Sequence, residues 1–325
     1  MAAMSYIEGI AQGIWEEMQR DPSVFLIGED IGAYGGAFKA TRGFLEHFGS
    51  ERVIDSVLSE SAIIGAATGA ALVGMRPVAE MQFADFVTCG FNQIVTNAAK
   101  IHYRWNLPIP WVLRLPSGGY IHGGPYHSAS TEAWFFHVPG LKIVAPSTPA
   151  DAKGLMKAAI RDNNPVLFFE FKYLYRRIKG EVPDGDVVVP IGKGDVKREG
   201  SDVAVITYGS TVHFALEAAQ TLANEHGIET RVVDLRTLLP FDKELVLESV
   251  KSTGKVLVLH EASLTGGVGG EIAAWISEHA FQYLDAPVKR LAASDTPVPF
   301  APTLEEAVLP TTGKIVEALT ELIRY

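Results

Sequence analysis

The stretch from Arg52 to Leu72 constrains the fold of this chain more than any other, because it joins a short apolar run to a long segment of small residues. Residues 53–58 predict a strand. The alanines and glycines that follow Ser61 predict a helix, since their pattern continues too far for a strand. Glu60 lies at the junction, and in an open α/β sheet ligands bind beyond the carboxyl ends of the strands, where the next helices begin. The stretch therefore predicts an α/β fold with a candidate site at Glu60.

Two interpretations of Glu60 follow from this position. In the first, Ser59 caps the helix and the first-turn N–H groups stabilise the carboxylate, while burial beneath a ligand raises the carboxyl pKa. These opposed influences suit a group that exchanges or shares a proton. In the second, Glu60 is a solvated acid at the start of a helix whose small residues serve only close packing. The stretch taken alone favours the second.

Composition excludes several classes of function. The chain has 325 residues, of which 47% are apolar, so it can bury a large core and is long enough for two domains. A net charge of −10 argues against nucleic-acid binding, which needs a basic surface, and the single cysteine, Cys89, excludes an internal disulfide bond. The first 20 residues lack the pattern of a signal peptide. No window reaches the roughly 18 successive apolar residues of a membrane helix, so we expect a cytoplasmic protein without a membrane partner.

Predicted strands and helices alternate in both halves of the chain, which is typical of parallel sheets covered by helices. In the first half, strands are predicted at 24–27, 53–58, 77–81, 110–114, 141–145 and 166–170, and helices at 6–19, from 61, at 83–103 and at 150–161. In the second half, strands are predicted at 203–207, 229–235, 255–259 and 288–291, and helices at 212–225, 243–251, 272–284 and 312–323. We therefore predict one domain over residues 1–185, a connector at 186–200 and a second domain over residues 201–325.

The loop of residues 116–130 is rich in glycine and contains two histidines. Long loops without regular structure tend to be functional, glycine lets the backbone approach a ligand, and histidine titrates near neutral pH. His127 is therefore a candidate for acid/base chemistry, whereas His122 is either a supporting residue or uninvolved. Further zinc ligands at suitable spacing are missing near this loop.

Other candidates have a structural interpretation beside the functional one. Glu29, after the predicted strand at 24–27, either faces the same crevice as Glu60 or is a solvated loop acid. Phe86 lies at a strand-to-helix turn and is either a core residue or a stacking partner for a planar ring. The turn of residues 162–165 is rich in oxygen atoms and can hold a cation, although such turns need none. The glycine-rich turn of residues 265–270 fits packing better than an anion cradle, because it lacks the third glycine of the dinucleotide motif.

Several motifs occur in a fixed order along the chain: Gly28–Asp30, Leu58–Glu60, Glu80–Phe86, Tyr126–Ser128, Pro139–Val144, Ile160–Pro165 and Asp234–Pro240. Together they resemble the β subunit of the thiamin-diphosphate-dependent 2-oxo acid dehydrogenases, over essentially the whole chain. The resemblance implies two parallel-sheet αβα domains, a transketolase-like pyrimidine-binding domain and a transketolase C-terminal-like domain. It also implies an α2β2 heterotetramer with an α subunit and a second β subunit, and a contact between the C-terminal domain and a lipoyl acyltransferase core.

The resemblance also assigns roles to residues. Glu60 matches the glutamate that bonds the aminopyrimidine ring nitrogen of thiamin diphosphate, Phe86 the aromatic residue stacked on that ring, and His127 the loop histidine near the substrate. Positions around the pyrimidine and the proton path match Glu29, Leu58 and Gln82, and the substrate pocket includes Phe83, Phe86 and His127. In some members a structural potassium ion is held by residues that match Ile109, Trp111, Val112, Ala159, Asp162 and Asn164.

The implied reaction is oxidative decarboxylation of a 2-oxo acid, pyruvate or branched-chain, followed by reductive acylation of lipoamide. The chain lacks the Gly–Asp–Gly pattern with a spaced asparagine that binds the diphosphate through magnesium; Gly185–Val187 and Gly194–Val196 come nearest. We therefore expect this chain to hold the pyrimidine half of the cofactor, and an α subunit to hold magnesium and the diphosphate. Two alternatives remain: an acetoin dehydrogenase β subunit, and a non-catalytic scaffold subunit, against which the presence of Glu60, Phe86 and His127 argues.

Overall fold

The structure is a computed structural model that describes residues 2–325, and its contacts divide the chain into two compact units. Unit 1 comprises the residues up to Ser117 together with Trp134–Ile191, and unit 2 comprises Gly118–Ala133 and Gly192–Tyr325. The loop with both candidate histidines therefore belongs to unit 2. Within residues 2–325, no helix is both long and apolar enough to cross a bilayer.

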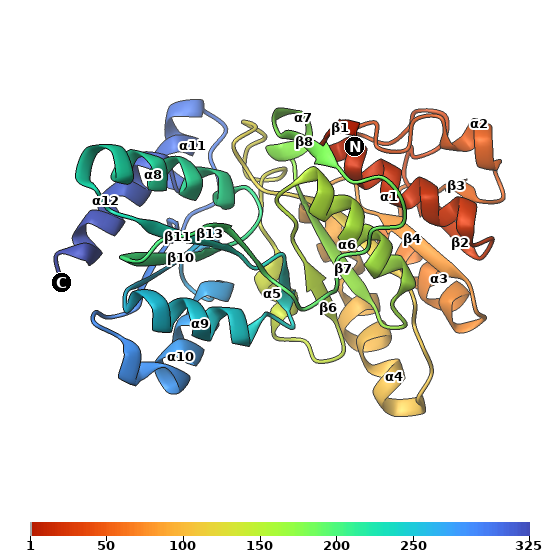
Figure 1. The fold of residues 1–325 in the computed structure, drawn as a ribbon. Coiled ribbons are helices and arrows are strands. Elements are labelled where there is room, and N and C mark those ends of the chain that lie inside the picture. Colours follow the sequence, from red (N-terminus) through yellow and green to blue (C-terminus); the bar gives the residue numbers. More distant parts are fainter. Residues whose placement is uncertain (1) are drawn as a thin grey trace. The chain divides into compact units, whose positions relative to one another are not determined.

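Unit 1 is built on a parallel sheet (Figure 1). In spatial order its strands are β6 (Lys142–Val144), β7 (Val166–Phe171), β5 (Val112–Ser117), β4 (Arg76–Glu80), β2 (Val24–Gly28) and β3 (Val53–Asp55). A separate antiparallel pair joins β1 (Ala2–Ser5) to β8 (Lys179–Val182). Since the strands of the main sheet run in one direction, the residues that follow β2, β3 and β4 meet at one edge of it.

The helices of unit 1 are α1 (Tyr6–Arg20), α2 (Phe44–Phe48), α3 (Glu60–Leu72), α4 (Ala99–Trp105), α6 (Pro149–Arg161) and α7 (Leu174–Arg177), and α5 (Glu132–Phe136) lies where the chain passes from unit 2 to unit 1. Helix α1 shows why the amphipathic pattern was informative: Ile10 and Ile14 are fully buried, and a capping box between Ser5 and Glu8 fixes its start. The prediction for this helix is confirmed.

Two predicted elements of unit 1 are wrong in detail. The strand predicted at 53–58 ends at Asp55, because Val57 and Leu58, at 80% and 79% exposure, lie outside the core. The helix predicted at 83–103 is a 3₁₀ helix η1 (Ala84–Gly90), a π-helix η2 (Gln93–Ala98) and then α4. At Gly90 an added Cβ would collide with the side chain of Ile64 on α3, so η1 lies closely against the helix that begins at Glu60. Irregular helices of this kind are frequent at functional sites.

Unit 2 has a sheet in the order β14 (Lys289–Ala293), β13 (Val256–Ser263), β10 (Val203–Thr207), β11 (Thr230–Asp234) and β9 (Asp195–Arg198), in which β9 is antiparallel. Its other elements are β12 (Thr237–Leu239), α8 (Thr211–His226), α9 (Lys243–Thr253), α10 (Val268–His279), η3 (Phe281–Tyr283), α11 (Pro302–Val308) and α12 (Thr312–Ile323). Figure 1 shows α8 and α12 on one face of this sheet and α9 and α10 on the other. Buried residues such as Val205, Leu222 and Leu319 join α8 and α12 to the sheet. Part of the predicted connector at 186–200 is thus strand β9.

Candidate active site

Three candidate residues lie at the carboxyl edge of the unit 1 sheet. Glu29 directly follows β2, Glu60 begins α3 after β3, and Gln82 follows β4. Because β2 pairs with both β3 and β4, the sheet itself brings these residues to neighbouring positions. This is the edge at which ligands bind in open α/β sheets.

Glu60 occupies the first position of α3 and is partly buried. Ser59 stands at the N-cap, but its hydroxyl makes no capping hydrogen bond, so the expected side-chain cap is wrong. The backbone of Ser59 instead lies near the carboxylate of Glu29 and lowers its pKa. The start of α3 therefore lies beside the end of β2.

Glu29 is only 6% exposed, and its Oε1 atom is buried without a hydrogen-bond partner among residues 2–325. Burial raises the pKa of this carboxyl, and the negative charges of Glu60 and Asp30 raise it further. A buried acceptor of this kind is costly unless a donor satisfies it. The edge thus presents two neighbouring carboxyl groups, one of which has room for a proton or for an N–H donor of a ligand.

Aromatic rings form a wall beside these acids. Phe83 and Phe86 are both partly buried and meet edge to face, with ring centroids 5.6 Å apart. Phe38 packs on Phe83 at 5.3 Å and on Tyr175 at 5.1 Å. Gln82, next to Phe83, donates from Nε2 to Asp30 Oδ2 at 3.1 Å. Sequence reasoning missed Phe38, which lies in an irregular loop between β2 and α2 without any periodic signal.

A buried ion cluster lies at the ends of the central strands and was also missed. Arg114 of β5 donates to both oxygens of Glu170, at 2.6 and 2.8 Å, and pairs with Glu80 of β4. Tyr175 donates its hydroxyl to Glu170 at 2.8 Å. Burial opposes the charge on Arg114, but Glu170 and Glu80 outweigh it and raise its pKa, while burial raises the pKa of Glu80. In the sequence, this ion cluster was indicated by one charged residue within each of three apolar strands.

The two candidate histidines lie in the loop of unit 2. His127 is partly buried, and its backbone N–H donates to the carbonyl of Gly124 at 3.2 Å. His122 is half-exposed, and its Nδ1 atom lies 2.7 Å from a carboxylate oxygen of Glu305. The remaining candidate, Leu58, is exposed in unit 1 directly before the α3 junction, where an apolar side chain is available to a ligand or a partner.

The residues matched to a potassium site gather near the end of α6. The N–H of Ile109 donates to the carbonyl of Asn163 at 3.0 Å, and the N–H of Asn164 donates to Asp162 Oδ1 at 2.8 Å. Arg76 donates to the carbonyl of Asp162 at 2.9 Å. Backbone groups form hydrogen bonds at the other matched positions as well, in or beside β5 for Trp111 and Val112 and at the turn after α6 for Ala159. Hydrogen-bond donors of the protein itself thus already occupy oxygen atoms of this turn.

Two further motifs are explained by packing or by ion pairs. An added Cβ at Gly267 or Gly269 would lie 2.5 or 2.7 Å from the ring of buried His260, so this turn is glycine-rich because it packs on a histidine. Of the acids nearest to a Gly–Asp–Gly pattern, Asp186 accepts from Lys157 and Arg161, and Asp195 pairs with Lys197. Among residues 2–325, no group of three His, Cys, Asp or Glu side chains is arranged to hold a metal ion.

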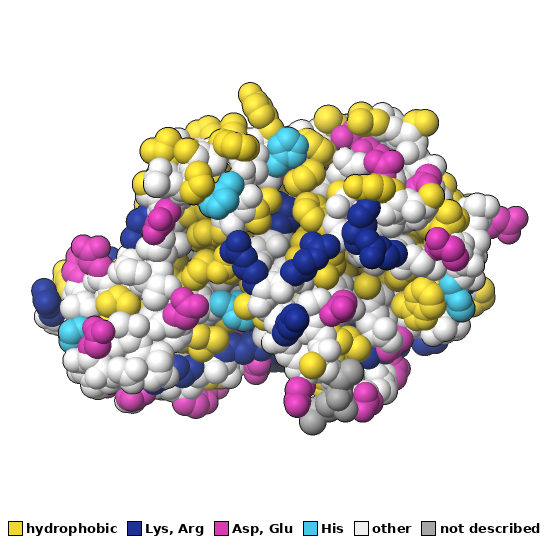
Figure 2. Space-filling model, turned by 90° about the horizontal axis from the view of Figure 1, so that it is seen from above, with side chains coloured by type: hydrophobic (Ala, Val, Ile, Leu, Met, Phe, Trp, Pro, Cys, Tyr) yellow, Lys and Arg dark blue, Asp and Glu magenta, His cyan; other side chains and the backbone are white. Residues whose placement is uncertain are grey.

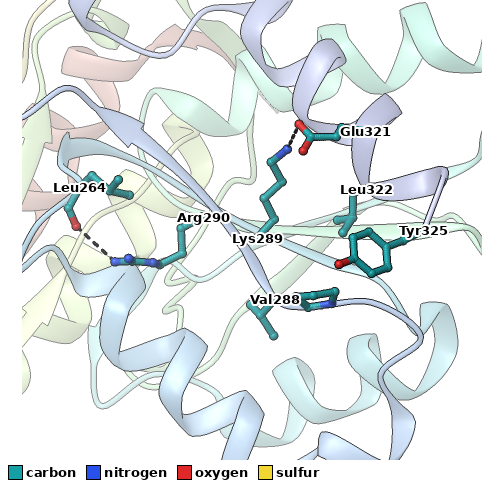
Figure 3. A pocket seen from close by; sticks show the side chains of 8 residues that line it. Leu264, Val288, Lys289, Arg290, Glu321, Leu322 and Tyr325 are labelled. Carbon is teal, nitrogen blue, oxygen red and sulfur yellow. Dashed lines mark hydrogen bonds and ion pairs between the residues drawn. The ribbon is translucent and has the colours of Figure 1, made fainter.

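A groove of about 380 Å³ in unit 2 runs beside the edge strand β14 (Figure 3). It is lined by Leu264, Pro287, Val288, Lys289, Arg290, Glu321, Leu322 and Tyr325. Lys289 pairs with Glu321 across it, and Arg290 donates to the carbonyl of Leu264 at 3.3 Å.

Apolar side chains also reach the surface at many points of the face in Figure 2, among scattered carboxylates.

Comparison with known proteins gives matches along the whole chain. The family described as transketolase, pyrimidine binding domain, matches residues 2–177, and the family described as transketolase, C-terminal domain, matches residues 192–315. Among solved structures, a split gene transketolase, an inactive beta4 tetramer, superposes with a TM-score of 0.83 and 27% identity, covering 99% of both chains.

Relatives that match over nearly their whole length are β subunits of three differently named enzymes. The 2-oxoisovalerate dehydrogenase subunit beta of Bacillus subtilis is 56% identical and covers 100% of both chains. The acetoin:2,6-dichlorophenolindophenol oxidoreductase subunit beta of Cupriavidus necator is 45% identical, covering 97% of this chain and 96% of the relative. The pyruvate dehydrogenase E1 component subunit beta of B. subtilis is 41% identical over 100% of both. With its two transketolase-type domains, this chain belongs to the β subunits of the 2-oxo acid dehydrogenase class of oxidoreductases.

Proposed function

We propose that this chain is the β subunit of a branched-chain 2-oxo acid dehydrogenase. With an α subunit it decarboxylates a 2-oxo acid and transfers the acyl group to lipoamide. The observation that carries the choice of substrate is the identity of 56% to a 2-oxoisovalerate dehydrogenase subunit, against 45% and 41% to the acetoin and pyruvate relatives.

The transketolase-type pyrimidine-binding domain implies thiamin diphosphate as the cofactor. The residues at the sheet edge fit its aminopyrimidine ring, because the buried Oε1 atom of Glu29 lacks a donor and aromatic side chains stand beside the acids. When bound, this cofactor supplies a nucleophilic carbon and an electron sink for decarboxylation.

The chain's own residues then have separate tasks. Glu60 would share a proton with the pyrimidine ring nitrogen, accepting the N–H when the ring is protonated, and Glu29, next to it, would relay protons. Phe86 stacks on the ring, while Gln82 and Leu58 border it and Phe83 lines the substrate pocket. His127 acts as the acid/base group when the acyl unit passes to lipoamide.

The α subunit supplies magnesium and the diphosphate site, in an α2β2 assembly that includes a second β subunit. One support is that Asp186 and Asp195 already form ion pairs within this chain. The other is that Val57, Leu58 and Tyr126 are 76–80% exposed although apolar or aromatic. Exposed apolar residues of this size suit a surface that a partner covers. Potassium at the turn after α6 remains a proposal that rests on the family resemblance.

We also propose that unit 2 contacts the lipoyl acyltransferase core. The groove along β14, with its apolar floor and the paired charges of Lys289 and Glu321, supports this surface (Figure 3). Replacing Tyr325 by serine is expected to weaken capture by the acyltransferase core while decarboxylation without that core stays unchanged. Equal capture of both forms in sedimentation would contradict the placement.

The substrate is tested with the enzyme assembled from this chain and its α subunit. Initial rates with 2-oxoisovalerate, pyruvate and acetoin, at equal cofactor and magnesium, should give a kcat/KM for 2-oxoisovalerate at least about tenfold above the other two. The 45% identical acetoin relative makes acetoin the second candidate, and a preference for acetoin would replace the proposal. The isolated chain is expected to bind the cofactor weakly; tight magnesium-dependent binding would contradict the shared site.

A further inference from the structure

The histidine loop has an unusual backbone that needs support from its surroundings. Gly118, Tyr120, His122 and Gly124 alternate along the chain and all have positive φ angles, of 83°, 59°, 58° and 74°. Tyr120 and His122 are not glycines, so each such conformation is strained and persists only where neighbouring groups hold it. Unit 2 must therefore contain the groups that impose this shape.

The first support is Glu261, at the end of β13. Its side chain is 3% exposed, and its carboxylate accepts hydrogen bonds from the backbone N–H of Gly119 and from the hydroxyl of Ser210. Charged acceptors make hydrogen bonds about twice as strong as neutral ones. The loop is thereby fixed at its first turn.

The second support is Glu305, on the short helix α11. Its side chain is 2% exposed; both carboxylate oxygens lie 3.3 Å from the backbone nitrogen of His122, and Oε2 lies 2.7 Å from His122 Nδ1. A buried carboxylate is costly unless it is satisfied. Among the described residues, His122 alone contributes the hydrogen bonds to the carboxylate of Glu305. The loop is therefore the partner of this buried carboxylate.

Contacts of neutral groups complete the support. The hydroxyl of Tyr120 donates to the carbonyl of Pro310 at 2.8 Å, and its ring packs on Phe214 at 4.9 Å. An added Cβ would lie 2.7 Å from a Leu309 methyl at Gly119 and 3.1 Å from the Phe300 ring at Gly124. Elements on both sides of α11 therefore shape the loop up to three residues before His127.

We propose that Glu261 and Glu305 are positioning residues, which clamp the loop so that His127 is presented in one orientation for the acyl-transfer step. The inference rests on the acid/base role proposed for His127. It gives the C-terminal domain a task in the reaction itself, beyond assembly. Loss of the clamp lowers the rate of acyl transfer to lipoamide, whereas decarboxylation, which depends on unit 1, continues.

The test compares Glu305→Ala with Glu306→Ala in the assembled enzyme. Alanine is the best helix former, so both variants preserve α11, and Glu306 is the exposed neighbour of the buried acid. Amide hydrogen exchange of residues 118–127 reports the clamp directly. Decarboxylation is followed with an artificial electron acceptor, and acyl transfer with lipoamide. Glu305→Ala should exchange faster over the loop and lose roughly 10- to 100-fold in acyl transfer, since misplaced catalytic groups cost this much.

The outcomes separate the clamp from the proposed function. Unchanged exchange in Glu305→Ala overturns the clamp, and faster exchange with normal acyl transfer overturns its positioning role. Glu305→Gln retains an acceptor and should restore most of both readings. If Glu305→Ala fails to assemble, Tyr120→Phe takes its place. This variant removes only the hydroxyl that donates to the carbonyl of Pro310, and loop exchange and acyl transfer are measured in the same way. Normal acyl transfer in His127→Ala would instead refute the role of His127 while leaving the exchange result standing.

Discussion

The carboxyl groups of Glu29 and Glu60 form an interacting pair at the junction of β2 and α3. Burial raises the pKa of Glu29, the charge of Glu60 raises it further, and the nearby backbone of Ser59 lowers it. Two acids in one site rarely carry the same charge, because like charges at short range disfavour double ionisation. The raised pKa of Glu29 lets this carboxyl hold a proton more readily than a solvated acid, which suits a cofactor that must gain and lose one.

Replacing Glu60 by glutamine should nearly abolish activity without unfolding the chain. The amide keeps the size of the side chain but cannot hold the proton at the pyrimidine nitrogen, so kcat with a 2-oxo acid should fall by roughly 10²- to 10⁴-fold. Glu51→Gln, at an exposed acid of the same unit, serves as the control. Full decarboxylation by Glu60→Gln would remove Glu60 from the mechanism.

Replacing Glu29 by glutamine should stabilise the protein while lowering activity. The folded protein holds this carboxyl with a raised pKa, so it binds a proton that the unfolded chain has already released, and stability is lost as pH rises through the folded pKa. Glutamine removes that loss. The melting temperature of the variant should exceed that of the wild type by more at pH 8 than at pH 5. A gain that shrinks as pH rises would show that Glu29 is ionised without penalty.

Periodic elements could be predicted from the sequence because their signal is local. Helix α12 begins at Thr312 and ends at Ile323 as predicted, since its apolar stripe and the Thr311 cap lie within the element itself. The strand–helix junction at Glu60 was also predictable, as was its place at the edge of the sheet. The end of β3 was not, because Val57 and Leu58 are apolar for a reason other than core packing.

Long-range contacts had no local signal. Arg114 and Glu170 meet because β5 and β7 pair, and Glu305 reaches His122 from a helix that was not predicted. The membership of the histidine loop in unit 2 also depends on such contacts. Single residues with chemical character were therefore easier to find than the groups that hold them in place.

Replacing Arg114 by methionine should destabilise the protein strongly. The change leaves Glu80 and Glu170 buried without their cation, and breaking a buried pair typically costs about 3–5 kcal/mol. Calorimetry of the assembled enzyme should show a clear fall in melting temperature, whereas Arg104→Met, on the exposed side of α4, should leave it unchanged. Equal melting temperatures for the two variants would show that the cluster is not a structural element.

Replacing Phe86 by alanine should weaken cofactor binding more than it affects stability. The partly exposed ring can stack on the pyrimidine, and an aromatic pair contributes about 0.5–1.5 kcal/mol beyond its buried area, so the apparent Kd should rise about tenfold. Phe86→Tyr keeps the ring and should retain the wild-type value. Activation curves with thiamin diphosphate measure both. Unchanged affinity in Phe86→Ala would place the ring away from the cofactor.

The other end of the histidine loop has its own titrating group. Glu132 is fully buried; Tyr208 donates to its Oε1 atom at 2.7 Å, and Oε2 has no partner among the described residues. Burial raises the pKa of this carboxyl to about 7, against the lowering effect of Tyr208 and with a further rise from Glu261. Since the unfolded chain releases this proton near pH 4.5, the folded state loses stability as pH rises toward 7.

Glu132→Gln should therefore stabilise the protein at alkaline pH and little at acid pH. The amide keeps the acceptor for Tyr208 and removes the charge, so the gain should grow between pH 5 and 7 and reach up to roughly 3 kcal/mol above pH 7.5. Thermal melting across this range measures it, with Glu271→Gln, at an exposed acid of unit 2, as the matched control. A gain that is independent of pH would mean that Glu132 does not titrate there, and that the loop is anchored by an ionised carboxylate at both ends.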